Sequence, residues 1–348
     1  MQNSFEKDFF TIAEICWSKK NYINDNSLKK IILFLKKKNC GKVNQVKKRS
    51  GLEKNSSNYL ITINKKKFIL KKWNKSLSKK KIKNILDLTI WLKEKKIFFP
   101  DIKIIDNNSL FLVDSFYWTI FSHSEGSHFS GEIKEFKNLS NSIGKFFSLL
   151  SKYPKKIDLG PKFYKKKSLL ILKKMKSNKR NWDSYFGKKT SSILKETWGS
   201  LEEMFLQNMK IKKVPHLKQI THFDLHPHNV IMKNKRVNCF LDFEACGVMN
   251  PGFGLAFSCL KLCKQTIIYN KISKKTLLYK KFIKLVGQHY PEIKKIQKYF
   301  FYFATSEVLR RILIIFEQNL EFKLKTWNKV LPIQLAHLEE SKILFNKK

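Results

Sequence analysis

Apolar and polar residues alternate in the first third of the chain, where the pattern predicts strands. In residues 58–72, apolar residues from Tyr59 to Ile63 alternate with polar or small ones, a polar run follows, and a short apolar run closes the segment. Alternation with a period of two, interrupted by a polar turn, is typical of a β-hairpin. A second hairpin is predicted where Asn107 and Asn108 separate the apolar runs IKIID and SLFLVDSFYWTIF.

Through most of the remaining chain, apolar residues recur at helical spacing. In residues 78–100, for example, Ile82, Ile85 and Leu86 share one helical face, and Pro100 ends the pattern. The other stretches with this spacing are residues 132–153, 163–210 and 273–346. Strand patterns therefore come first along the chain, and helical patterns follow.

A polar motif, THFDLHPHNVIMKNKRVNCFLDFEACG, interrupts the helical patterns at residues 221–247. Asp224 and Asn229 are five residues apart, the offset between base and metal-binding amide in kinase catalytic loops. Asp242 follows thirteen residues later, after an apolar run that predicts the second strand of a hairpin. Phosphoryl transfer needs a carboxylate to orient the acceptor hydroxyl and oxygen ligands for Mg²⁺. We predict Asp224 in the first role and Asn229 and Asp242 in the second.

Two other interpretations of this motif remain open. Asp224 could cap the turn that follows it, and Asp242 could cap the next segment. The three histidines of the motif could instead bind zinc, for which Cys239 is the only nearby candidate as a fourth ligand. These histidines are His222, His226 and His228.

The motif resembles that of the aminoglycoside phosphotransferase and choline-ethanolamine kinase family, which are small-molecule kinases with a protein-kinase-like fold. The resemblance rests on HFDLHPHN and on LDFEACG with its continuation NPGFGLA. It implies an α+β, bilobal fold with a small antiparallel-sheet N-lobe and a larger, mainly helical C-lobe. It also implies that Asp224 is the catalytic base and that His222 braces its loop. Asn229 and Asp242 would bind Mg²⁺, and Glu244 would lie close to the metal.

Further residues are implied for the nucleotide site. A kinase needs a lysine on a strand to pair with the phosphates of ATP. Lys71 directly follows the second apolar run of the first hairpin, and Lys72 is its alternative. The segment before this hairpin takes the place of the nucleotide-covering loop, and its backbone N–H groups could bind phosphate. The residues concerned are Ser56, Ser57 and Asn58.

The chain departs from the family pattern at two positions. The helix predicted within residues 78–100 lacks the glutamate that would pair with the strand lysine, and Asp87 is its only acidic residue before Glu94. Gly254 stands where the family usually has an aspartate that ties the metal loop to the next helix. These departures favour an alternative function, that of a catalytically weakened kinase-fold protein that binds nucleotide or a polyanion.

The family pattern divides the chain into three parts. Residues 1–45 form an N-terminal helical extension, residues 46–125 a nucleotide-binding N-lobe, and residues 126–348 a helical C-lobe that carries the catalytic loop and the metal-binding hairpin. A chain of 348 residues with 43% hydrophobic content is large enough to bury the core of one bilobal unit.

The net charge of +44 is typical of proteins that bind nucleic acid. Only five of the 71 basic residues are arginine, however, and the lysines are scattered along the whole chain. Together with abundant Asn, Ile and Phe, this composition indicates an AT-rich coding sequence, so no specific nucleic-acid partner is expected.

Three features of the sequence bear on the cellular location of the protein. The apolar run nearest to a membrane span, YFFYFATSEVLRRILIIF, is interrupted by Glu307, Arg310 and Arg311. The first residues do not form a signal peptide, and the six cysteines contain no CxxC pair. We therefore expect a cytoplasmic protein without a membrane span.

In function, the sequence predicts a phosphotransferase that uses ATP and Mg²⁺ to phosphorylate a hydroxyl group of a small metabolite. The DFE segment favours choline, ethanolamine or a related amino alcohol as the acceptor. Thiamine, homoserine and aminoglycosides are alternatives. Aromatic side chains could hold a quaternary ammonium group by cation–π attraction.

Overall fold

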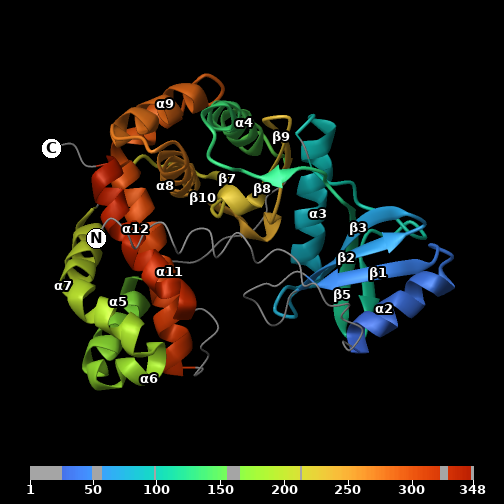
Figure 1. Ribbon diagram of the computed structural model, residues 1–348, viewed down its shortest axis with the longest axis horizontal. Coiled ribbons are helices and arrows are strands. Elements are labelled where there is room, and N and C mark those ends of the chain that lie inside the picture. The colour runs from blue at the N-terminus through green and yellow to red at the C-terminus, as the bar shows by residue number, and fades with distance from the viewer. Residues whose placement is uncertain are drawn as a thin grey trace. The chain divides into compact units, whose positions relative to one another are not determined.

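The computed structural model describes residues 26–48, 57–97, 99–154, 165–211, 214–321 and 328–345. The chain divides into two compact units, drawn in Figure 1. Of the described residues, those up to Ser127 form the first unit together with residues 231–234 and 238–241, and the others form the second.

The first unit is built on a five-stranded antiparallel sheet. Across the sheet, the strands are β1 (Val43–Lys48), β2 (Ser57–Ile63), β3 (Lys66–Lys72), β5 (Phe116–Ser122) and β4 (Phe111–Val113). Strands β2 and β3 form the first predicted hairpin, which is thereby confirmed. Its two-residue turn lies at Asn64 and Lys65, both with positive φ.

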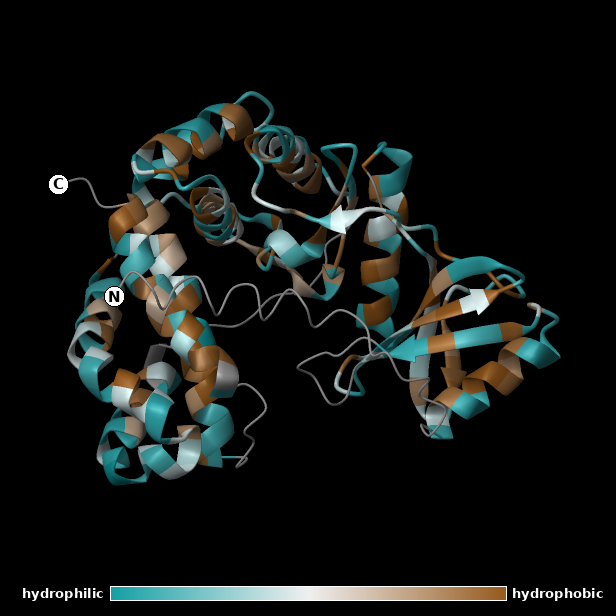
Figure 2. Ribbon diagram, in the orientation of Figure 1, coloured by the Kyte–Doolittle hydropathy of each residue, from teal (hydrophilic) through white to brown (hydrophobic). Residues whose placement is uncertain are grey.

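The alternation in β2 is explained by the helix that packs against the sheet. Every second residue of β2 is buried, and Tyr59 and Ile61 belong to the same apolar cluster as Leu28, Ile31 and Leu35 of helix α2 (Asn26–Lys37). In Figure 2, α2 accordingly shows apolar and polar positions on different sides. Burying each such side chain contributes roughly 1.5–3 kcal/mol. Of the predicted N-terminal extension, the part before α2 lies outside the described residues.

The second predicted hairpin is wrong in detail. The turn lies at Asp106 and Asn107, one residue earlier than predicted, and closes only an isolated bridge between Ile105 and Asn108. No strand ladder extends from it. The apolar run that follows is not one strand, because it turns back at Asp114 and Ser115 and becomes β4 and β5. Both of these turn residues have positive φ, which matches the strand twist of a two-residue hairpin. Two turns thus compete in this segment, and only the second one carries a ladder.

Helix α3 (Lys79–Glu94) confirms the first helical prediction. The hydroxyl of Ser78 accepts a hydrogen bond from the backbone N–H of Lys81 at 3.2 Å, which caps the first turn. The apolar positions that predicted the helix are buried along one face, and these are Ile82, Ile85, Leu86, Leu88, Thr89 and Leu92.

The second unit is mainly helical, as the apolar spacing predicted. Its helices are α4 (Ile133–Leu150), α5 (Lys165–Ser177), α6 (Trp182–Phe186), α7 (Lys188–Lys210), α8 (Pro251–Asn270), α9 (Lys275–Gly287), α10 (Ile293–Ile296), α11 (Phe300–Glu321) and α12 (Leu331–Phe345). Helix α11 packs against α12 and α8. The predicted α+β class, with an antiparallel sheet in the N-terminal part and helices in the C-terminal part, is confirmed.

Short strands form two further small sheets, and all of these strands except β6 (Ser127–His128), which precedes α4, lie between the helices α7 and α8 in the sequence. Strand β7 (Gln219–His222) pairs with β10 (Cys246–Met249), and β6, β8 (Val230–Lys233) and β9 (Arg236–Phe240) form a second small sheet. The β8–β9 hairpin is the one predicted within the polar motif, and its turn lies at Asn234 and Lys235. Among the described helices, none is both long and apolar enough to cross a membrane.

Helix α8 approaches strand β7 closely because residue 254 is a glycine. A Cβ atom at Gly254 would lie 2.4 Å from the carbonyl oxygen of His222 and 2.8 Å from the Cγ2 atom of Thr221. Such a distance leaves no space for any side chain. Gly254 therefore permits this helix packing, and the aspartate expected from the family pattern would not fit here.

Candidate active site

The polar motif is anchored in the second unit by strands β7 and β10. His222 pairs with Cys246 in this ladder, and the backbone N–H of Phe223 donates to the carbonyl of Ala245 at 3.0 Å. These bonds tie the loop of Asp224 to the 3₁₀ turn η3 (Phe243–Ala245), which directly follows Asp242. The two halves of the motif are therefore neighbours in space.

His222 lies behind the loop and is fully buried. Its Nδ1 atom accepts a hydrogen bond from the backbone N–H of Asp224 at 3.3 Å. Its ring packs edge-on against Phe146 and Phe243, with centroid distances of 6.3 and 5.6 Å. The geometry therefore suits a side chain that positions the backbone of Asp224.

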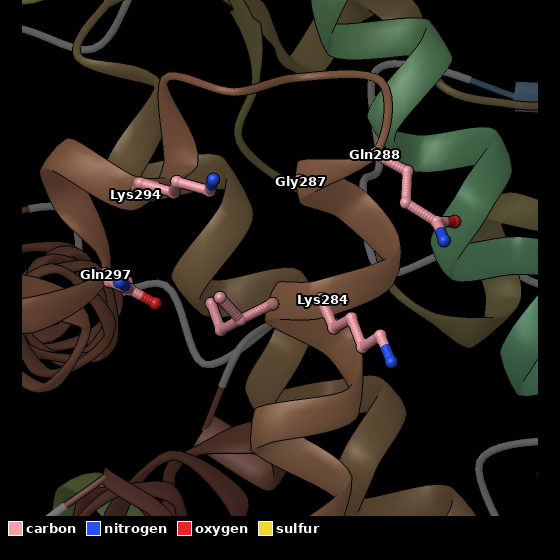
Figure 3. A pocket seen from close by; sticks show the side chains of 6 residues that line it. Lys284, Gly287, Gln288, Lys294 and Gln297 are labelled. Carbon is pink, nitrogen blue, oxygen red and sulfur yellow. The ribbon is translucent and has the colours of Figure 1, made fainter.

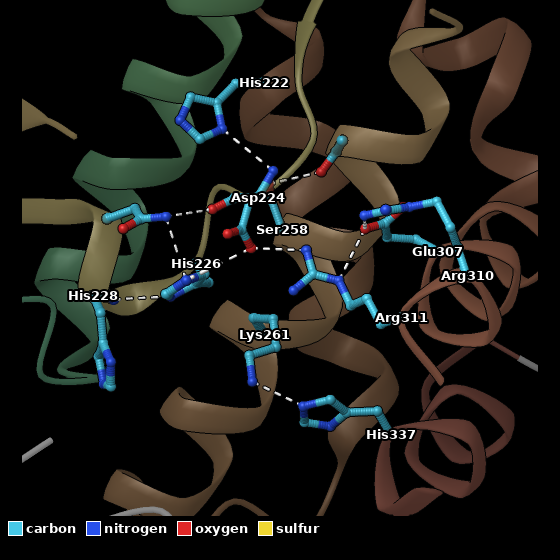
Figure 4. Close-up of polar contacts among 12 residues, drawn as sticks. His222, Asp224, His226, His228, Ser258, Lys261, Glu307, Arg310, Arg311 and His337 are labelled. Atoms are coloured by element: carbon cyan, nitrogen blue, oxygen red, sulfur yellow. Dashed lines mark hydrogen bonds and ion pairs between the residues drawn. The ribbon is translucent and has the colours of Figure 1, made fainter. Parts of the chain in front are cut away.

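The carboxylate of Asp224 faces a guanidinium group (Figure 4). Its Oδ1 atom lies 2.8 Å from Nη2 of Arg311 and 3.6 Å from Nε2 of His226, and the side chain is 21% exposed. Burial raises the pKa of Asp224, but the Arg311 charge and His226 outweigh burial and hold that pKa well below its usual range. The carboxylate is therefore ionised throughout the physiological pH range.

His226, rather than Asp224, caps the turn that follows. Its Nδ1 atom accepts from the backbone N–H of His228 at 3.2 Å, at the start of the 3₁₀ turn η2 (Pro227–Asn229). Burial lowers the pKa of His226 to about 3, although the charge of Asp224 acts in the opposite direction. The ring is thus neutral at pH 7, and the acceptor role of Nδ1 places its proton on Nε2.

The amide of Asn229 is oriented by the same loop. Its Nδ2 group donates to the backbone carbonyl of Asp224 at 2.8 Å, and the residue is buried. Because the amide nitrogen makes this bond, the Oδ1 atom is the one that can serve as a ligand for a cation.

Asp242 has an unusual backbone conformation. It follows β9 with φ 62° and ψ 52°, in the left-handed region, where aspartate and asparagine are tolerated better than most residues. It occupies the N-cap position of η3, but its side chain accepts no capping hydrogen bond there. The residue is exposed, and Glu244 in η3 is half-buried. The capping interpretation of Asp242 is therefore wrong.

The motif provides hard oxygen donors for a metal ion, namely an exposed carboxylate and an oriented amide oxygen. Such donors suit Mg²⁺, which usually binds one or two carboxylates together with substrate phosphates. Within the part of the chain that the structure describes, no three His, Cys, Asp or Glu side chains form a metal-binding group. A cation here would thus need phosphate oxygens of a bound nucleotide to complete its coordination.

The predicted nucleotide residues belong to the first unit. In β3, Lys72 is buried on the same side as Leu70, with its Nζ atom 4.0 Å from the ring centroid of Phe116. Lys71 projects to the opposite side of the strand, and its Nζ atom lies 4.6 Å from the ring of Trp73. Side chains alternate between the two faces of β3, so the two candidate lysines, Lys71 and Lys72, lie on opposite faces.

Strand β2 begins within the segment predicted as the nucleotide-covering loop. Ser57 and Asn58 pair with Lys72 and Lys71 across the β2–β3 ladder, so these two residues lie in a strand instead of a loop. Ser56 lies outside the described residues.

An ion cluster on α11 completes the environment of Asp224. Glu307, with a side chain only 1% exposed, accepts two hydrogen bonds from Arg310, at 2.8 and 2.6 Å, and one from Nε of Arg311 at 2.9 Å. In the sequence, these three residues interrupt the apolar run of α11 and so speak against a membrane span, but no role for them beside Asp224 was predicted. Charged residues at i, i+3 and i+4 in an apolar helix were the signal that could have indicated a buried ion cluster.

The family relationship follows from the sequence of the region that carries this site. Residues 48–268 match the profile of the phosphotransferase enzyme family, APH. The chain belongs to this family. The family membership predicted from the motif is confirmed, and the protein is an enzyme of the small-molecule kinase class. No curated protein is a significant match to the sequence.

Solved structures of similar fold include several small-molecule phosphotransferases. Spectinomycin phosphotransferase APH(9)-Ia, in complex with ADP and spectinomycin, has a TM-score of 0.69 at 13% identity, covering 90% of this chain and 93% of its own. The amicoumacin kinase hAmiN, in complex with AMP-PNP, Ca²⁺ and Ami, has a TM-score of 0.59 at 15% identity, covering 90% and 94%. A microcompartment-associated aminopropanol kinase has a TM-score of 0.59 at 13% identity, covering 91% and 95%. At these identities, the likeness shows the fold.

A separate hollow of this phosphotransferase lies beside helix α9 (Figure 3). It is lined by Ile283, Lys284, Gly287, Gln288, Lys294 and Gln297. None of these residues belongs to the polar motif, and none has a carboxylate that could bind a metal. The hollow is therefore not the candidate site of phosphoryl transfer.

Proposed function

We propose that this phosphotransferase transfers the γ-phosphoryl group of ATP, with Mg²⁺, to a hydroxyl group of a small metabolite. The observation that carries the proposal is the fixed loop of Asp224, which is held through its backbone by His222 and Asn229. A loop fixed in this way orients a carboxylate, which is the main task of the protein in phosphoryl transfer.

Asp224 is the residue that we assign to the acceptor hydroxyl. The hydroxyl oxygen forms a bond to the γ-phosphorus, and its proton passes to the Asp224 carboxylate. The bond between the γ-phosphorus and the β–γ bridging oxygen breaks, so that ADP leaves. The transition state is loose, and orientation of the hydroxyl contributes more than the strength of the base. The low pKa of Asp224 is compatible with this role.

We assign the metal to the Oδ1 atom of Asn229 and the carboxylate of Asp242, with Glu244 nearby in the same turn. Bound Mg²⁺ neutralises the negative charge of the nucleotide phosphates. In the first unit, Lys71 is the lysine that we assign to these phosphates, since Lys72 is buried against Phe116. Backbone N–H groups near Ser57 and Asn58 are further candidates for phosphate binding.

The relatives of similar fold support a small acceptor. One of these structures holds spectinomycin, the second is of an amicoumacin kinase, and the third is of an aminopropanol kinase. Within this range, the sequence alone favours an amino alcohol such as choline or ethanolamine.

One observation favours the alternative, a catalytically weakened protein that binds nucleotide. Arg311 forms an ion pair with Asp224, whose carboxylate should instead meet the acceptor hydroxyl. If this ion pair persisted in the presence of ATP and acceptor, Asp224 would have only a structural role.

Release of ADP separates the two functions. We expect the wild type to release ADP from Mg²⁺-ATP when one acceptor of a panel is present, the panel being choline, ethanolamine, serine, homoserine, thiamine and an aminoglycoside. We expect Asp224→Asn to lower this rate by about 10²-fold or more while ATP binding, measured by calorimetry, stays unchanged. ATP binding without acceptor-dependent release in the wild type would favour the weakened protein.

A further inference from the structure

The contacts of Asp224 also indicate which kind of acceptor fits. We infer that the acceptor carries an anionic group, a carboxylate or a phosphate, close to the hydroxyl that receives the phosphoryl group, and that Arg311 binds this anion. The inference rests on the proposed function, because it locates the acceptor beside Asp224.

Arg311 is placed to contact both Asp224 and a ligand. Its Nη2 group donates to Asp224 at 2.8 Å and its Nε group to Glu307 at 2.9 Å, and its side chain is 21% exposed. A guanidinium group has five N–H donors. The two bonds engage only part of them, and Figure 4 shows the group between the two carboxylates. An anion that binds to Arg311 would bring its own hydroxyl close to Asp224.

Two buried carboxylates of the flanking helices, those of Glu307 and Glu340, are already paired, which argues against a cationic acceptor. Glu307 accepts hydrogen bonds from both Arg310 and Arg311. On α12, Glu340 lies 2.7 Å from Lys264 and 2.6 Å from His337. An ammonium group beside Asp224 would meet Arg311, and neither Glu307 nor Glu340 would be free to balance its charge.

Two aromatic rings beside these arginines are partly covered as well. The Cζ atom of Arg310 lies 5.4 Å from the ring centroid of Phe223, and that of Arg311 lies 4.1 Å from the ring centroid of Phe257. A quaternary ammonium ligand is recognised by aromatic faces that it can approach. At each of these two rings, an arginine lies over one face, which choline could not use at the same time.

A further positive group lies below Arg311. Lys261 of α8 has its Nζ atom 2.8 Å from Nε2 of His337 (Figure 4). Burial, followed by the charge of Lys264, lowers the pKa of Lys261 to about 7. An anion in this region would stabilise the protonated form of Lys261, whereas a cationic acceptor would destabilise it. A preference for an anionic acceptor thus follows from residues on two helices, Lys261 on α8 and Arg311 on α11.

Pairs of acceptors that differ in one anionic group test the inference. Serine differs from ethanolamine, and homoserine from 3-aminopropan-1-ol, only by a carboxylate, and glycerol 3-phosphate differs from glycerol by a phosphate. Binding of each compound to the full chain with Mg²⁺ and a non-hydrolysable ATP analogue is measured by calorimetry. We expect at least one anionic member to bind about tenfold or more tightly than its partner, because charge-assisted bonds to arginine are strong. The pair that responds distinguishes carboxylate from phosphate.

Two matched variants assign the preference to Arg311. In Arg311→Gln and in Arg310→Gln, Glu307 keeps one arginine partner, so the structural loss is similar, but only Arg311 contacts Asp224. We expect Arg311→Gln to abolish the preference and Arg310→Gln to keep it. Thermal denaturation of both variants checks that they are folded.

The outcomes separate this inference from the proposed function. Equal or tighter binding of every uncharged or cationic member, or no binding of any anionic member, would overturn the inference. Acceptor-dependent ADP release with an amino alcohol alone would overturn it too, while the kinase function would stand. Binding of an anionic member that depends on Arg311, without any ADP release, would show Arg311 to be an anion-binding residue but would contradict the kinase function, and with it the identification of the anion as an acceptor.

Discussion

The ionisation of the Asp224 carboxylate depends on a side chain from a distant part of the sequence. Arg311 is 87 residues away along the chain and lies 2.8 Å from its carboxylate. The local motif predicts the loop, since His222 and Asn229 bond to its backbone within a few residues. It does not predict Arg311, because a contact over this separation leaves no mark in local spacing. The loop that holds Asp224 could be predicted from the sequence, whereas the ion pair and low pKa of its carboxylate could not.

Asp242 permits a clean test of the metal assignment, because its left-handed backbone suits asparagine but not alanine. We expect both Asp242→Asn and Asp242→Ala to raise the Mg²⁺ concentration for half-maximal activity by about tenfold or more, since each removes a ligand. Only Asp242→Ala should also lose about 1 kcal/mol of stability. An Asp242→Asn enzyme with the Mg²⁺ dependence of the wild type would exclude this residue as a ligand.

Secondary structure elements were predictable wherever local periodicity was strong. The β2–β3 hairpin and the helices α3 and α4 follow directly from alternation or helical spacing, because one face of each is buried. The hairpin at Asn107 was wrong, because a second pair of turn-forming residues, Asp114 and Ser115, lay within the predicted strand. Periodicity does not decide between two nearby turns, since the ladder that forms depends on the rest of the sheet.

The close packing of α8 on β7 gives a prediction at the scale of elements. We expect Gly254→Ala to lower the free energy of unfolding by roughly 1–3 kcal/mol, because its Cβ would lie 2.4 Å from the carbonyl oxygen of His222. Urea denaturation measures the change. Gly199→Ala in α7 is the control, since its Cβ would meet no atom within 4 Å.

The control should be stabilised by about 0.5–1 kcal/mol, because alanine is the better helix former. Equal effects of the two substitutions would show that the approach of α8 to β7 is not tight. For the same reason, we expect Gly254→Asp to destabilise the protein instead of increasing its activity. The glycine that departs from the family pattern at this position therefore serves the packing of α8 against β7.

The high net charge does not change the assignment of the whole molecule. A charge of +44 attracts polyanions in a way that weakens steeply with salt. The ion clusters described above are a different feature from this net charge, because they are formed by buried groups. Glu307 with its two arginines is one such cluster, and Glu340 with Lys264 and His337 is another. Of these groups, His337 and Glu340 have pKa values below their usual ranges, which makes stability dependent on pH.

The buried histidine on α12 leads to a prediction for the pH dependence of folding. Burial lowers the pKa of His337 from 6.5 to about 3 in the folded state, with the charge of Lys261 acting in the same direction. The unfolded chain therefore binds a proton that the folded protein does not bind, and stability falls as the pH decreases from about 6.5 to about 3. We expect His337→Gln, which keeps a donor and an acceptor, to show a shallower fall in urea denaturation over this range. An unchanged slope would mean that other groups dominate.

The central claim is that Asp224 directs the γ-phosphoryl group of ATP to a hydroxyl of a small acceptor. The most direct measurement follows the label of γ-³²P-ATP into the acceptor, in parallel for the wild type and for Asp224→Asn, with the acceptor pairs defined above. We predict that the wild type labels the anionic member of one pair and that Asp224→Asn, which still binds ATP, labels it about 10²-fold more slowly or worse. Equal labelling by the two proteins, or label found only in inorganic phosphate, would contradict the claim.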